Sequence, residues 1–175
     1  MAVHAFVDES TSGRYLLVTT LMPQHQLDAG RQALRALQLP GQRRIHFQSE
    51  RDSRRRQILG VLCGLPLQVW VRECGESDNL TARLTILSHL VPDLIDAGCT
   101  NLVLESDDSI VVHDERAIRA ARVKAGIDPD DLTFHHLRPY EEPLLWASDA
   151  VAWAWRKGGS WRAATSPIVA SNAVL

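Results

Sequence analysis

Three groups of acidic residues stand out in the 175-residue chain because each adjoins an apolar segment. Asp8 and Glu9 follow one apolar run, the group at 105–108 follows another, and Asp149 lies inside a third. Carboxylates held close together repel one another and resist burial, so such a cluster is best tolerated where a divalent cation neutralises it. Hard oxygen ligands of this kind suit Mg²⁺ or Mn²⁺. Two such ions can activate water and stabilise the leaving oxygen in phosphodiester hydrolysis.

The candidate metal ligands and catalytic acids are Asp8, Glu105 and Asp149, which lie far apart in the sequence. Asp107 competes with Glu105, since both follow the same apolar run. Asp107 and Asp108 have an alternative use as caps of the segment that follows them. Each acid also has an ordinary structural alternative, either as a surface turn residue or as the partner of an arginine.

Histidines and arginines supply the remaining candidates for catalysis and binding. His46 follows two arginines and is a candidate for phosphate contact or proton transfer, although a single histidine is more often structural. The region 43–56 is the only dense positive stretch, and its arginines are candidates for contacting a nucleic-acid backbone. The alternative is a solvated helix face. The candidate binding residues are Arg43, Arg44, Arg54 and Arg55. Of His135 and His136, one must face inward and the other outward if they lie on a strand.

Hydrophobic periodicity and turn residues predict the elements that position these side chains. The predicted strands are 3–7, 14–22, 67–74, 101–104 and 132–137. The predicted helices are 26–39, 49–64 with Ser49 as the N-cap, 79–97, 113–125 and 141–157. The last helix would place Glu142 and Asp149 on one face, since they are seven residues apart. Short turns between the first two strands predict a hairpin, and the later alternation of helices and strands predicts parallel crossovers.

Length and composition indicate one α/β domain over residues 1–160, followed by a tail at 161–175. The net charge of −2 gives no global attraction to nucleic acid, so any contact with nucleic acid must come from local patches. The three cysteines show no metal-binding spacing, which favours a reducing compartment such as the cytoplasm. We expect no signal peptide and no membrane span. Nothing in the sequence indicates an oligomeric state.

The beginning AFVDES, the following strand RYLLVTT and the late segment EEPLLWASDAVAWAW together resemble an uncharacterised bacterial family with a ribonuclease-H-like fold. Its members have a first strand ending in Asp-Glu-Ser and a late helix with a Ser/Ala-Asp-Ala motif, matched here by residues 8–10 and 148–150. The resemblance implies a mixed five-stranded sheet with helices on both faces and a carboxylate at Glu105. One departure is that Thr11 and Ser12 precede Gly13, where the family has glycine directly after the serine.

The leading hypothesis is therefore a divalent-metal-dependent nuclease that uses Mg²⁺ or Mn²⁺. An alternative is a catalytically degenerate ribonuclease-H-like module that binds nucleic acid or a protein, and the departure after Ser10 motivates it. A third is a structural domain whose acids are only surface charges. DNA, RNA and hybrid substrates are not distinguished by the sequence.

Overall fold

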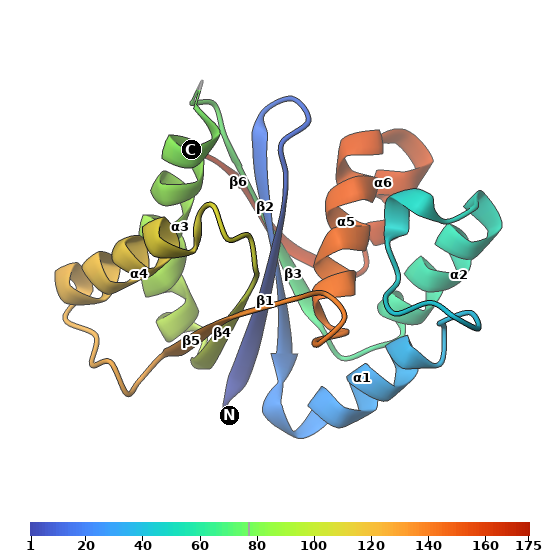
Figure 1. Ribbon diagram of the computed structural model, residues 1–175, viewed down its shortest axis with the longest axis horizontal. Helices are drawn as coiled ribbons and strands as arrows, with labels where there is room; N and C mark the ends of the chain where they lie inside the picture. The colour runs from blue at the N-terminus through green and yellow to red at the C-terminus, as the bar shows by residue number, and fades with distance from the viewer. Residues whose placement is uncertain (77) are drawn as a thin grey trace.

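The computed structural model describes residues 1–76 and 78–175. A mixed sheet of six strands lies in the order β5-β4-β1-β2-β3-β6 (Figure 1). The strands are β1 Val3–Ser10, β2 Tyr15–Pro23, β3 Gln68–Cys74, β4 Cys99–Glu105, β5 Thr133–Leu137 and β6 Val169–Val174. The helices are α1 Leu27–Arg35, α2 Asp52–Cys63, α3 Asn79–Asp96, α4 Val111–Ala125, α5 Leu145–Lys157 and α6 Gly159–Thr165. Two short 3₁₀ turns, Gln24–Gln26 and Phe47–Ser49, precede α1 and α2.

The central strand β1 has a different kind of neighbour on each side. It pairs antiparallel with β2, with Asp8 opposite Val18. It pairs parallel with β4, with Val7 opposite Leu104. Parallel strands end at the same edge of a sheet, so the residue after Val7 and the residue after Leu104 lie side by side. The register therefore brings Asp8 next to Glu105.

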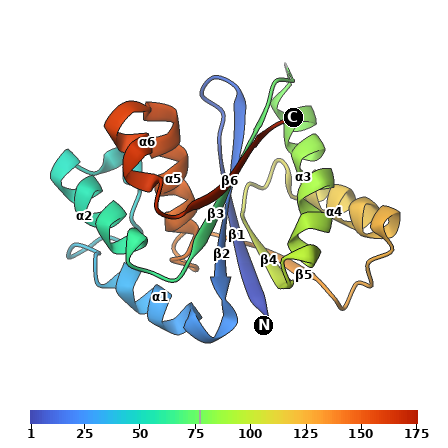
Figure 2. The same ribbon diagram turned by 180° about the vertical axis from the view of Figure 1, so that it is seen from behind.

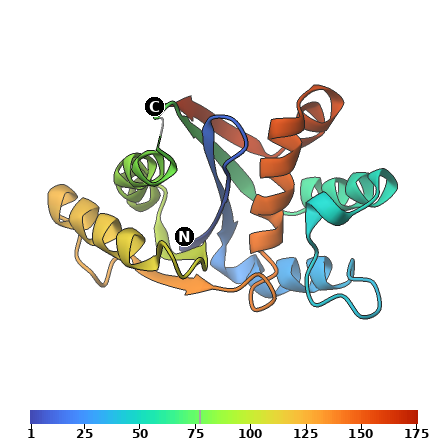
Figure 3. The same cartoon turned by 45° about the horizontal axis from the view of Figure 1, so that its top comes forward.

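Helices cover both faces of the sheet. Figures 1 and 3 show α3 and α4 on one face, and α1, α2, α5 and α6 on the other. Side chains alternate between the two sides of a strand, so Phe6 packs into the core beneath α5 while Ala5 and Val7 pack beneath α3. At residues 5–7 β1 is buried on both faces, so its sequence there is continuously apolar rather than alternating.

The predicted α/β class, the mixed sheet and the helices on both faces are confirmed, whereas the strand count is six instead of five. The additional strand, β6, lies within residues 161–175, which were predicted to be a tail. It pairs parallel with β3 at the edge of the sheet (Figure 2). Its side chains are small and mostly exposed, so they carry no alternating apolar pattern from which a strand is predicted. Within the described residues, no helix combines the length and the apolar character needed to cross a membrane.

Two helix beginnings predicted from the sequence are wrong. The last long helix begins at Leu145 rather than at residue 141, so Glu142 does not share a helix face with Asp149. The buried carboxylate of Glu142 instead accepts hydrogen bonds from the Leu144 amide, at 3.0 Å, and from Arg31. Ser49 does not cap α2, because it lies in the preceding 3₁₀ turn and the helix starts at Asp52.

Candidate active site

A cleft of about 410 Å³ opens where β1 and β4 end against α5. The structure brings Asp8, Glu105 and Asp149 together in this cleft, from three separate parts of the sequence. The cleft is lined by Asp8, Glu9, Ser10, Thr11, Ser12, Arg44, His46, Gln48, Glu105, Asp149, Ala152 and Trp153. It therefore combines a carboxylate cluster with one arginine and one histidine, as the sequence predicted, and adds a tryptophan wall.

Small residues let α5 approach the sheet closely enough to present Asp149 to the end of β1. Ala147 and Ala150 are completely buried on the side of α5 that packs on β1 and β2. Ser148 is also completely buried, and its hydroxyl donates a hydrogen bond to the carbonyl oxygen of Phe6. The residue next to Asp149 is thereby tied to the strand that ends in Asp8.

Asp8 is the acid most affected by its surroundings. Its pKa is raised well above the usual value, first because burial disfavours the ionised form and then because Glu105 and Asp149 are negative. Its carboxylate accepts one hydrogen bond of 2.7 Å from the Glu9 amide. The repulsion within this cluster is the electrostatic condition that a bound cation would relieve.

Asp149 is held by the segment before α2. Its Oδ2 accepts a 2.9 Å hydrogen bond from the Phe47 amide and lies 3.6 Å from His46 Nδ1. The close approach of the Asp149 carboxylate raises the pKa of His46, an effect that partial burial opposes. His46 is therefore protonated to a higher pH than a free histidine. No local sequence pattern relates these residues, since Phe47 and Asp149 are about a hundred positions apart.

Glu105 is partly shielded by a cation that the chain itself supplies. Arg44 Nη1 lies 3.8 Å from Glu105 Oε1, and both side chains are about one-third exposed. Burial raises the pKa of Glu105, the positive charge of Arg44 opposes that rise, and Asp149 adds to it. The cleft thus contains an internal counter-charge for one of its three acids.

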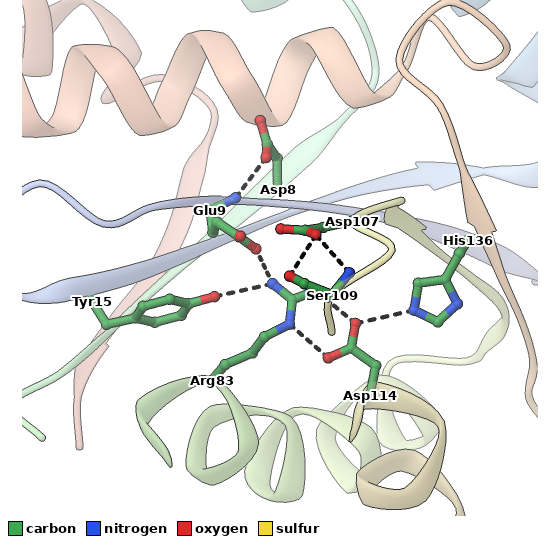
Figure 4. A network of polar contacts seen from close by, with 8 residues as sticks. All are labelled: Asp8, Glu9, Tyr15, Arg83, Asp107, Ser109, Asp114 and His136. Atoms are coloured by element: carbon green, nitrogen blue, oxygen red, sulfur yellow. Dashed lines mark hydrogen bonds and ion pairs between the residues drawn. The ribbon is translucent and has the colours of Figure 1, made fainter. Parts of the chain in front are cut away.

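Glu9 also lines the cleft, but its carboxylate belongs to a network on the α3 side of the sheet (Figure 4). It forms an ion pair with Arg83, which is almost completely buried and also donates a 3.0 Å hydrogen bond to the Tyr15 hydroxyl oxygen. Arg83 forms a two-point ion pair with Asp114, at 2.6 and 2.8 Å. His136 Nε2 lies 3.0 Å from the same aspartate. His136 is therefore the inward residue of the histidine pair.

The structure does not bring Asp107 to the cleft of Asp8, Glu105 and Asp149. Its Oδ1 accepts hydrogen bonds from the amide and hydroxyl of Ser109, at 2.9 and 2.7 Å (Figure 4). These bonds lower the pKa of Asp107. These bonds close a turn in the loop before α4 and do not cap the helix, whose N-cap is Ile110. Glu105 is therefore the acid of this segment that lines the cleft.

The four predicted binding arginines occupy different environments. Arg44 lines the cleft, and Arg43 stacks over the ring of Tyr140 at 4.4 Å. Arg54 binds Glu50, the Gln57 side chain and the carbonyl oxygen of Leu37, so its charge is used inside the protein. Arg55 donates to the carbonyl oxygens of Phe47 and Gln48, at 3.1 and 2.6 Å, and thereby braces the segment that holds Asp149.

A divalent cation such as Mg²⁺ or Mn²⁺ is held in proteins by carboxylate oxygens together with waters. Among residues 1–76 and 78–175, no group of three or more His, Cys, Asp or Glu side chains is already arranged as a metal cage. The chemistry of the donors nevertheless fits Mg²⁺ or Mn²⁺, because three carboxylates share one open cleft. Burial, and after it the negative charges of Glu105 and Asp149, raise the pKa of Asp8 at the same place. The residues present therefore fit a hard cation in charge and ligand type.

The fold was compared with solved structures. The chain is similar to RNase HII in its complex with PCNA from Archaeoglobus fulgidus, with a TM-score of 0.56, 17% identity, and 89% of this chain and 73% of that one covered. The chain is also similar to ribonuclease H2 from Pyrococcus horikoshii OT3, with a TM-score of 0.52 and 12% identity. The match covers 89% of this chain and 72% of that one. For a variant of Bst-RNase HIII the TM-score is 0.50 and the identity 13%. The match covers 89% of this chain and 54% of that one.

These likenesses define a ribonuclease-H-like fold. At such low sequence identity, the similarity establishes the fold and not the function. No protein-family model and no curated protein matches the chain.

Sequence reasoning missed several residues that shape the site. Ser148 was matched only as part of a motif, although its buried hydrogen bonds dock α5 on the sheet. Arg83 occupies the apolar stripe of α3, between Leu80 and Leu87, and a charge at such a position is the available signal for a buried ion pair. Trp153, on the same helix as Asp149, also lines the cleft.

Proposed function

We propose that this protein is a divalent-metal-dependent nuclease that hydrolyses phosphodiester bonds. The observation that carries the proposal is the meeting of Asp8, Glu105 and Asp149 in one cleft at the carboxyl ends of β1 and β4. The fold, which is that of RNase HII and RNase HIII, supports it as an analogy. The odd number of cysteines without metal-binding spacing is the reason for placing this activity in the reducing cytoplasm.

Asp8, Glu105 and Asp149 would hold one or two Mg²⁺ or Mn²⁺ ions. When bound, the metal would supply charge neutralisation at the scissile phosphate and activation of water. Asp149 is already positioned by the Phe47 amide, and Asp8 by the Glu9 amide. Glu105 pairs only loosely with Arg44, so it is the acid that adjusts most easily.

His46 is suited to move a proton in this cleft. Its contact with Asp149 favours the imidazolium form, and the side chain is close to half exposed. A protonated histidine beside the acids can donate to the oxygen of a leaving group. Holding a substrate falls to Arg44 and Arg43, whose guanidinium groups are not committed to buried partners in the described structure. Arg54 and Arg55 act indirectly by supporting this segment.

The experiment is hydrolysis of end-labelled RNA, DNA and RNA–DNA hybrid in the presence of Mg²⁺ or Mn²⁺. The wild-type protein is expected to cleave at least one of the three. The double variant Asp8→Asn/Asp149→Asn is expected to lose activity by at least roughly 100-fold, the scale on which removal of transition-state charge stabilisation acts. Asp107→Asn is the matched control, because Asp107 lies only two residues after Glu105 but does not line the cleft. Equal cleavage by the wild type and the double variant contradicts the proposal.

A second function, a catalytically degenerate module that binds nucleic acid, is favoured by one observation. Arg44 already lies beside Glu105, and the described acids form no ready metal cage. Calorimetric titration with Mn²⁺ separates the two functions. Binding in the micromolar to millimolar range that is lost in Asp8→Asn supports the nuclease, whereas nucleic-acid binding without any metal response supports the degenerate module.

A further inference from the structure

A second cavity lies between α2 and α6, beside the acidic cleft. Its volume is about 190 Å³, and it is lined by Arg56, Leu59, Gly60, Cys63, Ser160, Trp161 and Ala164. None of these lining residues is acidic, so the only formal charge at the cavity is positive. A cavity with an exposed arginine and an aromatic wall is suited to an anionic, flat ligand.

Two tryptophans connect this cavity with the acidic cleft. Trp153 lines the cleft and Trp161 lines the second cavity. Their ring centroids are 5.4 Å apart at an interplanar angle of 83°, an edge-to-face contact. The turn between α5 and α6 makes this contact possible. Gly158 and Gly159 both have positive φ angles, of 72° and 54°, which favour glycine.

An arginine stacks on each of the two tryptophans. The guanidinium of Arg55 lies 4.2 Å from the ring centroid of Trp153, and that of Arg56 lies 4.9 Å from Trp161. Arg55 donates hydrogen bonds to backbone carbonyl oxygens and forms an ion pair with Asp52. Arg56 is exposed, and no acidic side chain of the described residues pairs with it. Its charge is therefore available to a ligand on the surface.

We propose that an unpaired strand of nucleic acid leaves the acidic cleft across Trp153 and Trp161 and reaches the second cavity beside Arg56. This inference rests on the proposed nuclease function and adds a substrate feature, namely a single-stranded extension next to the cleavage site. Bases stack on tryptophan rings without regard to sequence, and an exposed arginine contacts the backbone phosphate.

The test compares cleavage of a blunt RNA–DNA hybrid with cleavage of the same hybrid carrying a six-nucleotide overhang at either end. The wild type is expected to prefer one overhang substrate over the blunt one. Trp161→Ala is expected to lower this preference by about tenfold, the order of effect of one base–aromatic stacking contact. Trp161→Phe keeps the apolar packing and a stacking surface, so it should restore most of the preference and shows that a loss is not due to misfolding.

Arg56→Gln tests the charged part of the path by binding rather than cleavage. Fluorescence anisotropy with a single-stranded oligonucleotide in EDTA is expected to show a shallower salt dependence, with the slope of log affinity on log salt reduced by about 0.7. The matched control is Arg162→Gln. Arg162 also stacks on a tryptophan, at 3.6 Å from Trp155, but lines neither cavity, so the slope should not change.

The outcomes separate this inference from the proposed function. If the wild type cleaves blunt and overhang substrates equally well, the single-strand path is wrong and the nuclease stands. If the wild type cleaves nothing, the nuclease fails, and the oligonucleotide titration alone decides the path. The single-strand path is wrong if Trp161→Ala and Arg56→Gln bind the oligonucleotide with the affinity and salt slope of the wild type. That is also the result expected if the second cavity binds a protein instead.

Discussion

The buried hydroxyl of Ser148 lies 2.8 Å from the carbonyl oxygen of Phe6 and joins the long helix α5 to the central strand β1. Thr20 Oγ1 lies 2.8 Å from the same hydroxyl on the β2 side. Since Ser148 donates its only proton to Phe6, Thr20 is the donor in the second bond. The contact stands one residue before Asp149 and two residues before Asp8, so it fixes the distance between two of the three acids.

The substitution Ser148→Ala therefore tests how the site is positioned. It removes two buried hydrogen bonds and leaves the Thr20 hydroxyl and the Phe6 carbonyl without this partner. We expect a loss of about 1–3 kcal/mol in the free energy of unfolding, measured by urea denaturation. Ser166→Ala is the control, because Ser166 is exposed at the end of α6. Equal stability of the two variants contradicts the positioning role.

The metal-free protein should become more stable when a carboxylate leaves the cluster. Asp8 has a raised pKa in the folded protein, so folding binds a proton at pH values between its unfolded pKa, about 3.9, and the raised folded value. Stability therefore falls as the pH rises through that window, and the penalty is complete above it. In EDTA at neutral pH, Asp8→Asn should raise the free energy of unfolding by roughly 1 kcal/mol.

Thermal unfolding of the two proteins over a pH series measures this effect. Asp107→Asn, at an exposed acid outside the cleft, should leave the pH profile of stability in this range nearly unchanged. A decrease in stability for Asp8→Asn at neutral pH would mean that the three acids do not repel one another in the folded protein.

The buried ion network of Arg83, Asp114 and His136 makes the opposite pH prediction. Burial opposes ionisation of Asp114, but its bonds with His136 and Arg83 outweigh burial and lower its pKa. Its contribution to stability is present above the unfolded pKa of about 3.9 and is lost as the pH falls through the lower folded pKa. Asp114→Asn removes the fully buried, two-point charged partner of Arg83 and leaves only the more exposed Glu9, so we expect a loss of about 3–5 kcal/mol in urea denaturation.

An exposed ion pair provides the comparison for this variant. Asp108 binds Arg138 at 2.9 Å, and the aspartate side chain is 80% exposed. Asp108→Asn should cost at most about 1 kcal/mol, since solvent screens such pairs. Similar losses for Asp108→Asn and Asp114→Asn would contradict the view that the network around Arg83 is a buried structural centre.

The contact between His46 and Asp149 predicts a titration that NMR can follow. In metal-free protein the pKa of His46 should lie above 6.5, because the carboxylate of Asp149 stabilises the imidazolium. Asp149→Asn should bring it down towards that value, while Asp107→Asn should leave it in place. If the pKa of His46 is the same in the wild type and in Asp149→Asn, the two side chains are not in contact in solution.

Much of this architecture could be predicted from residue patterns. The apolar run before Asp8 indicated the first strand, and the helix predicted at 79–97 is observed as α3, Asn79–Asp96. The acid at Asp149 drew attention because its neighbours are almost all apolar. These are local signals of burial and turn formation, and the structure places both acids in the one cleft.

Other features depend on contacts between distant residues, which a single sequence does not encode visibly. Glu142 was expected on the same helix face as Asp149 because the two are seven residues apart, yet its partner is Arg31, 111 residues earlier. The contacts of Arg44 with Glu105 and of Phe47 with Asp149 arise from tertiary packing in the same way. β6 escaped prediction because its exposed, small side chains show no burial pattern.

The most direct test of the central claim is a crystal structure of the protein soaked in Mn²⁺, with anomalous scattering used to locate the ion. We expect a manganese peak bound by carboxylate oxygens of Asp8, Glu105 and Asp149, with Arg44 moved away from Glu105. The same soak of Asp8→Asn/Asp149→Asn should show no peak there. A wild-type crystal that takes up no manganese in the cleft at millimolar concentration, with Arg44 still on Glu105, would contradict the account.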